Sequence, residues 1–374
     1  MLFVTLLFVE RNDFMGGFTA VIQLVVTVIA GMYFFTRLKI ENEGERQFKS
    51  EYKAEAEQLN KMRHIHLSEP MTEMVRPTST DEVLGQEDGI RALRAALWGK
   101  NPQHVIIYGP PGVGKTAAAR VILEEVKKSP MTPFLKDAPF IEADAAIMRC
   151  DERGFTDPLI GSVHDPIYQG SGSFGQNVIP QPMPGAVTRA HGGVLFLDEI
   201  GELPNEQLNK LLKVLEDRRV LLESSYYSSS NKKLPTYIRD IFENGLPADF
   251  RLIGATTAPP DKIPEAVRSR CVEIYFKTLA RSDVVRIVYE ASIRCGIALE
   301  NGVKECIGDY AQNGRDAVKI LQSASNVARM EGRRTVTLVD TRWIIEVSRC
   351  EKRRDDYLKD GGKIIDISII KPHN

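Results

Sequence analysis

Cysteine is scarce in this chain: there are five cysteines among 374 residues, and none of them form a C-x-x-C pair. Their number is odd, and their spacing fits neither a disulfide framework nor a zinc ribbon. A disulfide-stapled secreted domain is therefore excluded, and reduced thiols in a cytosolic compartment are expected. The five positions are Cys150, Cys271, Cys295, Cys306 and Cys350.

The chain also lacks an excess of either basic or acidic residues. The chain has 49 Lys and Arg against 50 Asp and Glu, which gives a formal net charge of −1. Proteins that bind nucleic acid through its phosphates usually carry a basic surplus or a basic patch. This balance gives no such signature, so no nucleic-acid partner is expected.

Charge is absent altogether from residues 14–36, a run of 23 residues rich in Val, Ile and Phe. Such a run is long enough to cross a bilayer as a helix. Several basic residues follow it, and only Arg11 precedes it. The positive-inside rule then predicts a single-pass anchor in the cell membrane, with the rest of the chain on the cytoplasmic side. The basic residues that follow are Arg37, Lys39, Arg46, Lys49 and Lys53.

Two features of this N-terminal region stay open. Translation could start at Met1 or at Met15, and the second start would leave a more ordinary anchor. Residues 37–69 are charged and helix-prone. They are predicted to form either a helical stalk or a flexible tether.

A glycine-rich loop lies between an apolar run at 103–108, typical of a buried parallel strand, and a helix-forming run at 117–126. Its glycines let backbone N–H groups approach phosphates, and the helix N-terminus favours negative charge. Lys115 is expected to reach the outer phosphates and Thr116 to ligate magnesium. The loop consists of Gly109, Pro110, Pro111, Gly112, Val113, Gly114, Lys115 and Thr116.

Acidic and hydroxyl residues follow two further apolar runs. Asp198 ends the run 194–198 and is a predicted magnesium ligand, while Glu199 is the candidate general base that orients the attacking water. The run 249–257 ends in two threonines, of which Thr257 is the preferred contact to the γ-phosphate or the water. Together with the loop, these residues predict binding and hydrolysis of ATP.

Two arginines complete the candidate site. Arg270 is a candidate arginine finger, which would stabilise the transferring phosphoryl group of a neighbouring subunit. Arg315 stands at the start of a predicted helix with apolar residues at helical spacing, and it is expected to reach back to the nucleotide.

Three other segments have a predicted local structure. Leu208, Leu211, Leu212 and Leu215 have the spacing of an amphipathic helix. Residues 224–248, rich in Ser, Tyr, Asn and Pro, are predicted to be a loop insertion. The last helix is expected from Thr341 to about Arg349, capped by the segment that begins at Thr337.

The order of these motifs over about residues 70–350 resembles the AAA+ ATPase family. The resemblance implies an α/β P-loop domain at 70–278, with a parallel sheet flanked by helices, and a small all-α lid domain at 279–350. It also implies ATP and Mg²⁺ as ligands and a homo-oligomer, in the form of a hexameric ring. The segment from Arg76 to Glu87 is similar to the family's adenine pocket, with Val83 and Leu84 as its contacts.

Within that family, residues 157–170, 184–193 and 244–251 are similar to B-type Lon proteases, which are membrane-anchored. This resemblance implies a motor that unfolds and translocates unfolded or damaged proteins, with Ile167 and Tyr168 as the pore loop that grips the substrate.

Lon proteases end in a peptidase domain with a serine–lysine dyad, and here only 24 residues follow Cys350. We therefore expect the ATPase portion without its peptidase, with 351–374 as a linker. Peptidase activity is then expected only if such a domain is joined or supplied in trans. The alternatives are a stand-alone membrane-bound remodeller and a nucleic-acid motor, because residues 253–257 and 269–271 also resemble clamp loaders and branch-migration helicases.

Overall fold

The computed structural model divides the chain into two compact units, Met1–Glu69 and Pro70–Asn374. In the first unit, the described residues 32–33 and 58–63 are helical. Among the residues that the structure describes, no helix is both long enough and apolar enough to cross a membrane. The predicted span at 14–36 lies almost entirely outside them, so it stays a prediction. The described residues are 32–33, 58–63, 68–148, 157–164, 180–224, 227–228, 234–353, 357–360 and 363–366.

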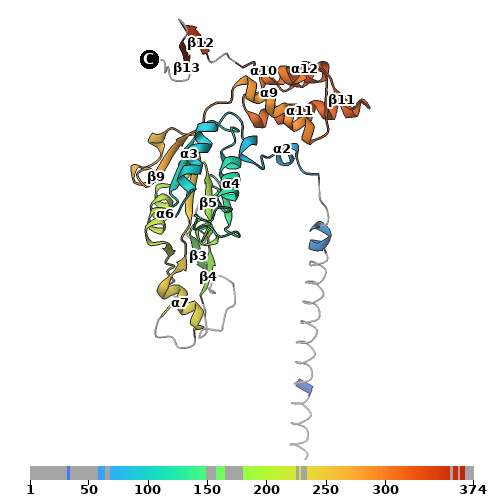
Figure 1. The fold of residues 1–374 in the computed structure, drawn as a ribbon. Coiled ribbons are helices and arrows are strands. Elements are labelled where there is room, and N and C mark those ends of the chain that lie inside the picture. The colour runs from blue at the N-terminus through green and yellow to red at the C-terminus, as the bar shows by residue number, and fades with distance from the viewer. Residues whose placement is uncertain are drawn as a thin grey trace, which may run out of the picture. The chain divides into compact units, whose positions relative to one another are not determined.

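The second unit is built on a five-stranded sheet in the order β2-β5-β8-β1-β9, and every pair of neighbours is parallel (Figure 1). This confirms the predicted parallel α/β fold. The strands are rich in Val, Ile and Leu, because both faces of a parallel sheet are covered. They are β1 (His104–Tyr108), β2 (Phe140–Asp144), β5 (Val194–Asp198), β8 (Arg251–Thr256) and β9 (Cys271–Tyr275).

Alternate residues of each strand feed two separate hydrophobic cores. Val105 and Phe196 pack under helices α3 (Glu87–Leu97) and α4 (Lys115–Val126). Ile106 and Leu197 belong to the core on the other face, with the leucines of α6 (Asn205–Asp217). The predicted amphipathic helix is therefore confirmed. Helices α5 (Ala186–Arg189) and α8 (Glu265–Arg268) add Val187 and Val267 to the same core.

Short elements connect these layers. The prediction of a loop insertion over 224–248 is wrong for α7 (Thr236–Asn244), whose Ile238 and Phe242 lie one turn apart and are buried. The Phe242 ring stacks on Tyr227 at 4.6 Å between centroids, so tertiary packing stabilises a helix that polar composition had hidden. The other short elements are η3 (Ile200–Glu202), η4 (Pro260–Lys262) and the antiparallel pairs β3 (Gly161–His164) with β4 (Gln181–Pro184), β6 (Arg219–Val220) with β7 (Leu246–Pro247), and β12 (Tyr357–Asp360) with β13 (Lys363–Asp366).

Four helices lie within 279–350, the range predicted to form the lid (Figure 1). The last of them begins at Leu338, three residues before the expected position, because Thr337 is its N-cap. The Oγ1 of Thr337 accepts the Asp340 N–H at 3.3 Å, and the Asp340 carboxylate accepts the Thr337 N–H at 2.9 Å. The lid consists of α9 (Arg281–Arg294), α10 (Val303–Tyr310), α11 (Gly314–Met330), α12 (Leu338–Val347) and the two-stranded pair β10 (Ala298–Leu299) with β11 (Thr335–Val336).

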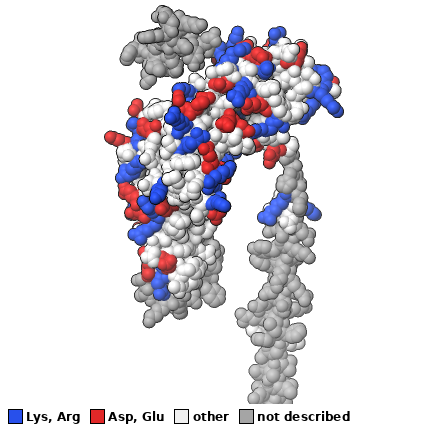
Figure 2. Space-filling model, viewed as in Figure 1, with Lys and Arg blue, Asp and Glu red and all other residues white. Residues whose placement is uncertain are grey.

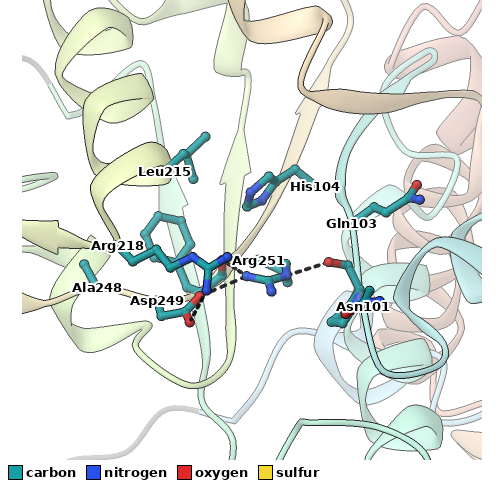
Figure 3. A pocket seen from close by; sticks show the side chains of 10 residues that line it. Asn101, Gln103, His104, Leu215, Arg218, Ala248, Asp249 and Arg251 are labelled. Carbon is teal, nitrogen blue, oxygen red and sulfur yellow. Dashed lines mark hydrogen bonds and ion pairs between the residues drawn. The ribbon is translucent and has the colours of Figure 1, made fainter.

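A cavity of about 360 Å³ lies at the amino ends of β1 and β8 (Figure 3). Figure 3 shows Arg218 and Arg251 gathered around Asp249, at 3.6 Å and 3.0 Å from its carboxylate oxygens. Both guanidinium groups share this one carboxylate as a partner.

His104 lines the same cavity, and its Nδ1 accepts the Leu252 N–H at 3.0 Å. Burial and the Arg251 guanidinium lower the pKa of His104 from 6.5 to about 4. The His104 imidazole therefore takes up a proton in the unfolded chain at a pH where it stays neutral in the folded chain. Stability is complete above the unfolded pKa and falls as the pH drops from there toward 4.

We expect the wild-type chain to lose about 2 kcal/mol more unfolding free energy between about pH 7 and about pH 5 than His104→Asn. The asparagine carbonyl can still accept the Leu252 N–H, but it does not titrate. Urea unfolding at both pH values measures the difference. The same pH dependence in both proteins would contradict a neutral, buried His104.

Candidate functional site

A second pocket, of about 460 Å³, brings together most of the residues that the sequence predicted for nucleotide binding. It is lined by residues 111–116 of the glycine-rich loop, by the end of β5 and by the start of α11, whereas Gly109 and Pro110 do not line it. These are the carboxyl ends of the strands, where open α/β sheets bind ligands. The predicted residues that line it are Val83, Leu84, Pro111, Gly112, Val113, Gly114, Lys115, Thr116, Asp198, Glu199 and Arg315.

The glycine-rich loop joins β1 directly to α4, which begins at Lys115, two residues before the predicted helix. Gly112 and Gly114 have φ values of +71° and +96°, in the left-handed region that favours glycine. The lid lies against this loop, because the Gly314 N–H donates to the Gly112 carbonyl at 3.2 Å. A Cβ on Gly112 would lie 2.5 Å from the Oδ1 of Asn313. The loop backbone and the first turn of α11 are therefore in direct contact.

Lys115 is 8% exposed, and its ammonium group donates to the carbonyls of Gly109 at 2.7 Å and Pro110 at 3.1 Å. Burial lowers the pKa of Lys115, and the carboxylates of Glu199 and Asp198 oppose this change. A buried cation that donates its hydrogen bonds to neutral carbonyls is suited to an anionic ligand.

The acidic pair occupies the end of β5 and the residue after it. Asp198 accepts the Glu199 N–H at 3.1 Å, and burial raises the pKa of the Asp198 carboxyl. Glu199 has a φ of +49°, which is uncommon for a residue other than glycine.

Thr257 is the partner of Glu199. The Oε2 of Glu199 accepts the Thr257 N–H at 3.0 Å and its hydroxyl at 3.1 Å. Thr256 is buried, and its hydroxyl accepts the Ala258 N–H at 3.0 Å. Of the two threonines, Thr257 is the one that contacts a predicted catalytic residue, because β8 lies beside β5 in the sheet.

The site fits magnesium as P-loop proteins hold it. Among the described residues, no group of three or more His, Cys, Asp or Glu could hold a metal ion. A P-loop site does not need one, because Mg²⁺ keeps several waters and takes phosphate oxygens along with one or two protein ligands. Thr116 and Asp198 line the same pocket and supply a hydroxyl and a carboxylate.

Two charged residues that line the pocket, Arg120 and Glu142, were not predicted from the sequence. Arg120 and Glu142 form an ion pair at 2.6 Å, and the Arg120 guanidinium lies 4.8 Å from the Phe140 ring centroid. Arg120 stands one helical turn after Thr116, a spacing that could have indicated it. Glu142, on β2, had no such local signal.

Arg270 lies outside this pocket. Its guanidinium donates to the Ala266 carbonyl at 2.8 Å and pairs with Glu216, and its side chain is 40% exposed. An exposed position is compatible with action on a neighbouring subunit, which stays a prediction. The predicted pore-loop residues Ile167 and Tyr168 lie outside the described residues.

The chain is similar to one protein family and to several known proteins. The family described as magnesium chelatase, subunit ChlI, matches residues 79–236. The chain is 53% identical over 342 residues to Lon protease 2 of Bacillus subtilis (strain 168), covering 91% of this chain and 62% of that protein. It is 28% identical over 250 residues to the archaeal Lon protease of Thermococcus kodakarensis, covering 60% of this chain and 36% of that protein. The chain thus spans less than two thirds of both relatives.

Among solved structures, the RuvB Holliday junction branch migration motor of Thermotoga maritima is similar over 73% of both chains. The identity is 19% and the TM-score is 0.47, so no functional argument rests on this likeness. The identity of 53% over 91% of the chain, together with the assembled P-loop site, is the stronger finding. This chain is an AAA+ ATPase, and it is similar to a Lon protease over 91% of its length.

Proposed function

We propose that this chain is the ATP-hydrolysing motor of a membrane-anchored, B-type Lon protease, which unfolds proteins and translocates the polypeptide. The observation that carries the proposal is its 53% identity to Lon protease 2 over 91% of its length, a stretch that includes the whole nucleotide site. Peptidase activity requires a serine–lysine peptidase domain, either joined to the motor or supplied in trans.

The chemistry follows from the positions of the side chains. The glycine-rich loop and the Lys115 ammonium bind the phosphates of ATP. Thr116 and Asp198 would hold Mg²⁺, which would neutralise charge on the phosphates. The Glu199 carboxylate, oriented by Thr257, takes the proton of the attacking water. Arg315 reaches the nucleotide from the lid.

Arg270 acts on the ATP of the neighbouring subunit, which requires an oligomer, and a homohexameric ring is the arrangement we propose. The segment 14–36 anchors this ring in the cell membrane, with the ATPase on the cytoplasmic side. Unfolded or damaged proteins are the proposed substrates. Figure 2 shows basic and acidic side chains intermixed over the visible face of the described residues, which favours a protein substrate over nucleic acid.

The test is ATP-dependent unfolding of a fluorescent folded protein that carries an unstructured tail. We expect fluorescence to fall with ATP and to persist with a non-hydrolysable analogue. Tyr168→Ala is expected to slow unfolding about tenfold or more, whereas Tyr168→Phe keeps the aromatic ring and most of the rate. ATP hydrolysis that is stimulated by DNA and not by unfolded protein would reject this function in favour of a nucleic-acid motor.

A further inference from the structure

Residues 70–84 lie along the nucleotide pocket and are called the strap here. The strap contains α2 (Met71–Met74) and the short helix η1 (Thr80–Glu82). It ends in Val83 and Leu84, which are buried and line the pocket. The position of the strap therefore shapes the end of the pocket where the predicted adenine contacts lie.

Side chains of the α/β domain hold the C-terminal part of the strap. Arg94 on α3 donates to the Thr80 hydroxyl at 3.3 Å and to Glu125 of α4 at 3.0 Å. Just beyond the strap, the buried Gln86 side chain donates to the Lys277 carbonyl at 2.7 Å and accepts its N–H at 2.9 Å. This end of the strap is fixed to the domain that carries the phosphate site.

The lid contacts the strap in two ways: α2 packs against α11, and a guanidinium group at the end of α9 makes hydrogen bonds to the strap. Arg294, the last residue of α9, donates to the Glu82 carboxylate at 2.8 Å and to the Arg76 carbonyl at 2.9 Å. The second oxygen of Glu82 accepts the Thr78 N–H at 2.6 Å. Arg76, Glu82 and Arg294 all line the nucleotide pocket. The planar, forked guanidinium can hold both acceptors at once, which an ammonium cannot do in the same geometry.

We propose that the Arg294–Glu82 ion pair is a positioning contact that closes the lid onto the strap and limits the rate at which the nucleotide leaves. The inference rests on the proposed function, since it concerns release of the product of ATP hydrolysis. Separation of the lid from the strap breaks both hydrogen bonds of Arg294. Arg294 is thus a positioning residue, which acts through the strap.

The electrostatics of Glu82 agree with this geometry. Burial opposes ionisation of the carboxyl, but the Thr78 N–H and the Arg294 guanidinium outweigh it and hold the pKa of Glu82 below its ordinary value. The carboxylate stays charged at neutral pH. The ion pair is therefore present under the conditions of turnover.

The same helix supplies a matched control. Arg281 pairs with Asp309 of α10 at 2.5 Å, within the lid, and neither residue lines the nucleotide pocket. Arg281→Gln removes a guanidinium from the same helix and leaves the Arg294 contacts in place. A general loss of helix charge would affect both variants alike, whereas the proposed contact involves Arg294 alone.

The experiment measures dissociation of a fluorescent ADP analogue by stopped flow, along with kcat and KM for ATP. Arg294→Gln and Glu82→Gln are each expected to raise the dissociation rate about tenfold, the effect of one charge-assisted hydrogen bond. The double variant is expected to match Arg294→Gln, because that change already removes the contact with Glu82. Arg294→Lys keeps the charge and is expected to restore part of the slow release. KM rises while kcat is maintained, and Arg281→Gln behaves as wild type.

Thermal unfolding of each variant identifies loss of folding, and Arg294→Lys supplies a gentler change if Arg294→Gln is unstable. Unchanged dissociation in folded variants, or effects that add in the double variant, would overturn the positioning role. In both cases a wild-type chain that hydrolyses ATP leaves the proposed function intact. A wild-type chain that binds no ADP analogue rejects the proposed function and the positioning role with it.

Discussion

Glu199→Gln is expected to lower kcat for ATP hydrolysis by a factor of about 10²–10⁴ while ATP binding persists. The amide cannot take the proton of the attacking water, so the chemical step slows. Its carbonyl oxygen can still accept the hydrogen bonds that Thr257 donates at 3.0 and 3.1 Å, so the side chain keeps its place. Loss of turnover without loss of affinity distinguishes a catalytic base from a residue that only shapes the pocket.

Phosphate release gives the turnover, and retention of labelled ATP gives the binding. Glu202→Gln is the matched control, because Glu202 is exposed and lies three residues further along the same segment. We expect this control to hydrolyse ATP at the wild-type rate. If Glu199→Gln did the same, another group would have to activate the water.

Gly112→Ala is expected to weaken ATP binding about 100-fold, a change of about 2.7 kcal/mol in binding free energy. The new Cβ would stand 2.5 Å from the Oδ1 of Asn313, and the φ of +71° is strained for alanine. Asn313 is not free to move away, because its Oδ1 accepts the Asp316 N–H at 2.9 Å as the cap of α11. The loop, the lid helix or both must shift from the positions that form the site.

Gly296→Ala separates the effect of a strained φ from the effect of the steric contact with Asn313. Gly296 has a φ of +63°, but a Cβ there would have no neighbour within 4 Å. We expect this control to lose about 1 kcal/mol of stability and to bind ATP as wild type does. Isothermal titration with ATP and thermal unfolding give both quantities. Equal affinities in the two variants would show that the contact between Gly112 and Asn313 is not needed for binding.

The sequence predicted the phosphate end of the site because its chemistry is local. The glycines, Lys115 and Thr116 are consecutive, and Asp198 and Glu199 follow a strand that its apolar residues make plain. The parallel sheet then brings the ends of β5 and β8 together. For the same reason, Thr257 could be chosen before its contact with Glu199 was visible.

The end of the pocket beside the strap had no local sequence motif that could predict its contacts. Arg294 and Glu82 are 212 positions apart, so only the folded lid makes them partners. Arg120 and Glu142 meet because α4 and β2 lie close in space. Helix α7 was not predicted for another reason. The polar residues before it suggested a loop, whereas Ile238 and Phe242 are buried on one face of a helix. Local composition describes a segment by itself, whereas burial depends on what packs against it.

The contact of Gly314 with Gly112 also has a mechanical consequence. Helix α11 has 17 residues. At a rise of 1.5 Å per residue it extends about 25 Å from the phosphate loop. If α11 rotates as a rigid body about its first turn, a tilt of about 5° displaces its far end by about 2 Å. Met330 stands at that end, with 87% of its surface exposed. A small displacement at the phosphate loop therefore becomes a larger displacement at the C-terminal end of α11, where a neighbouring molecule could contact it.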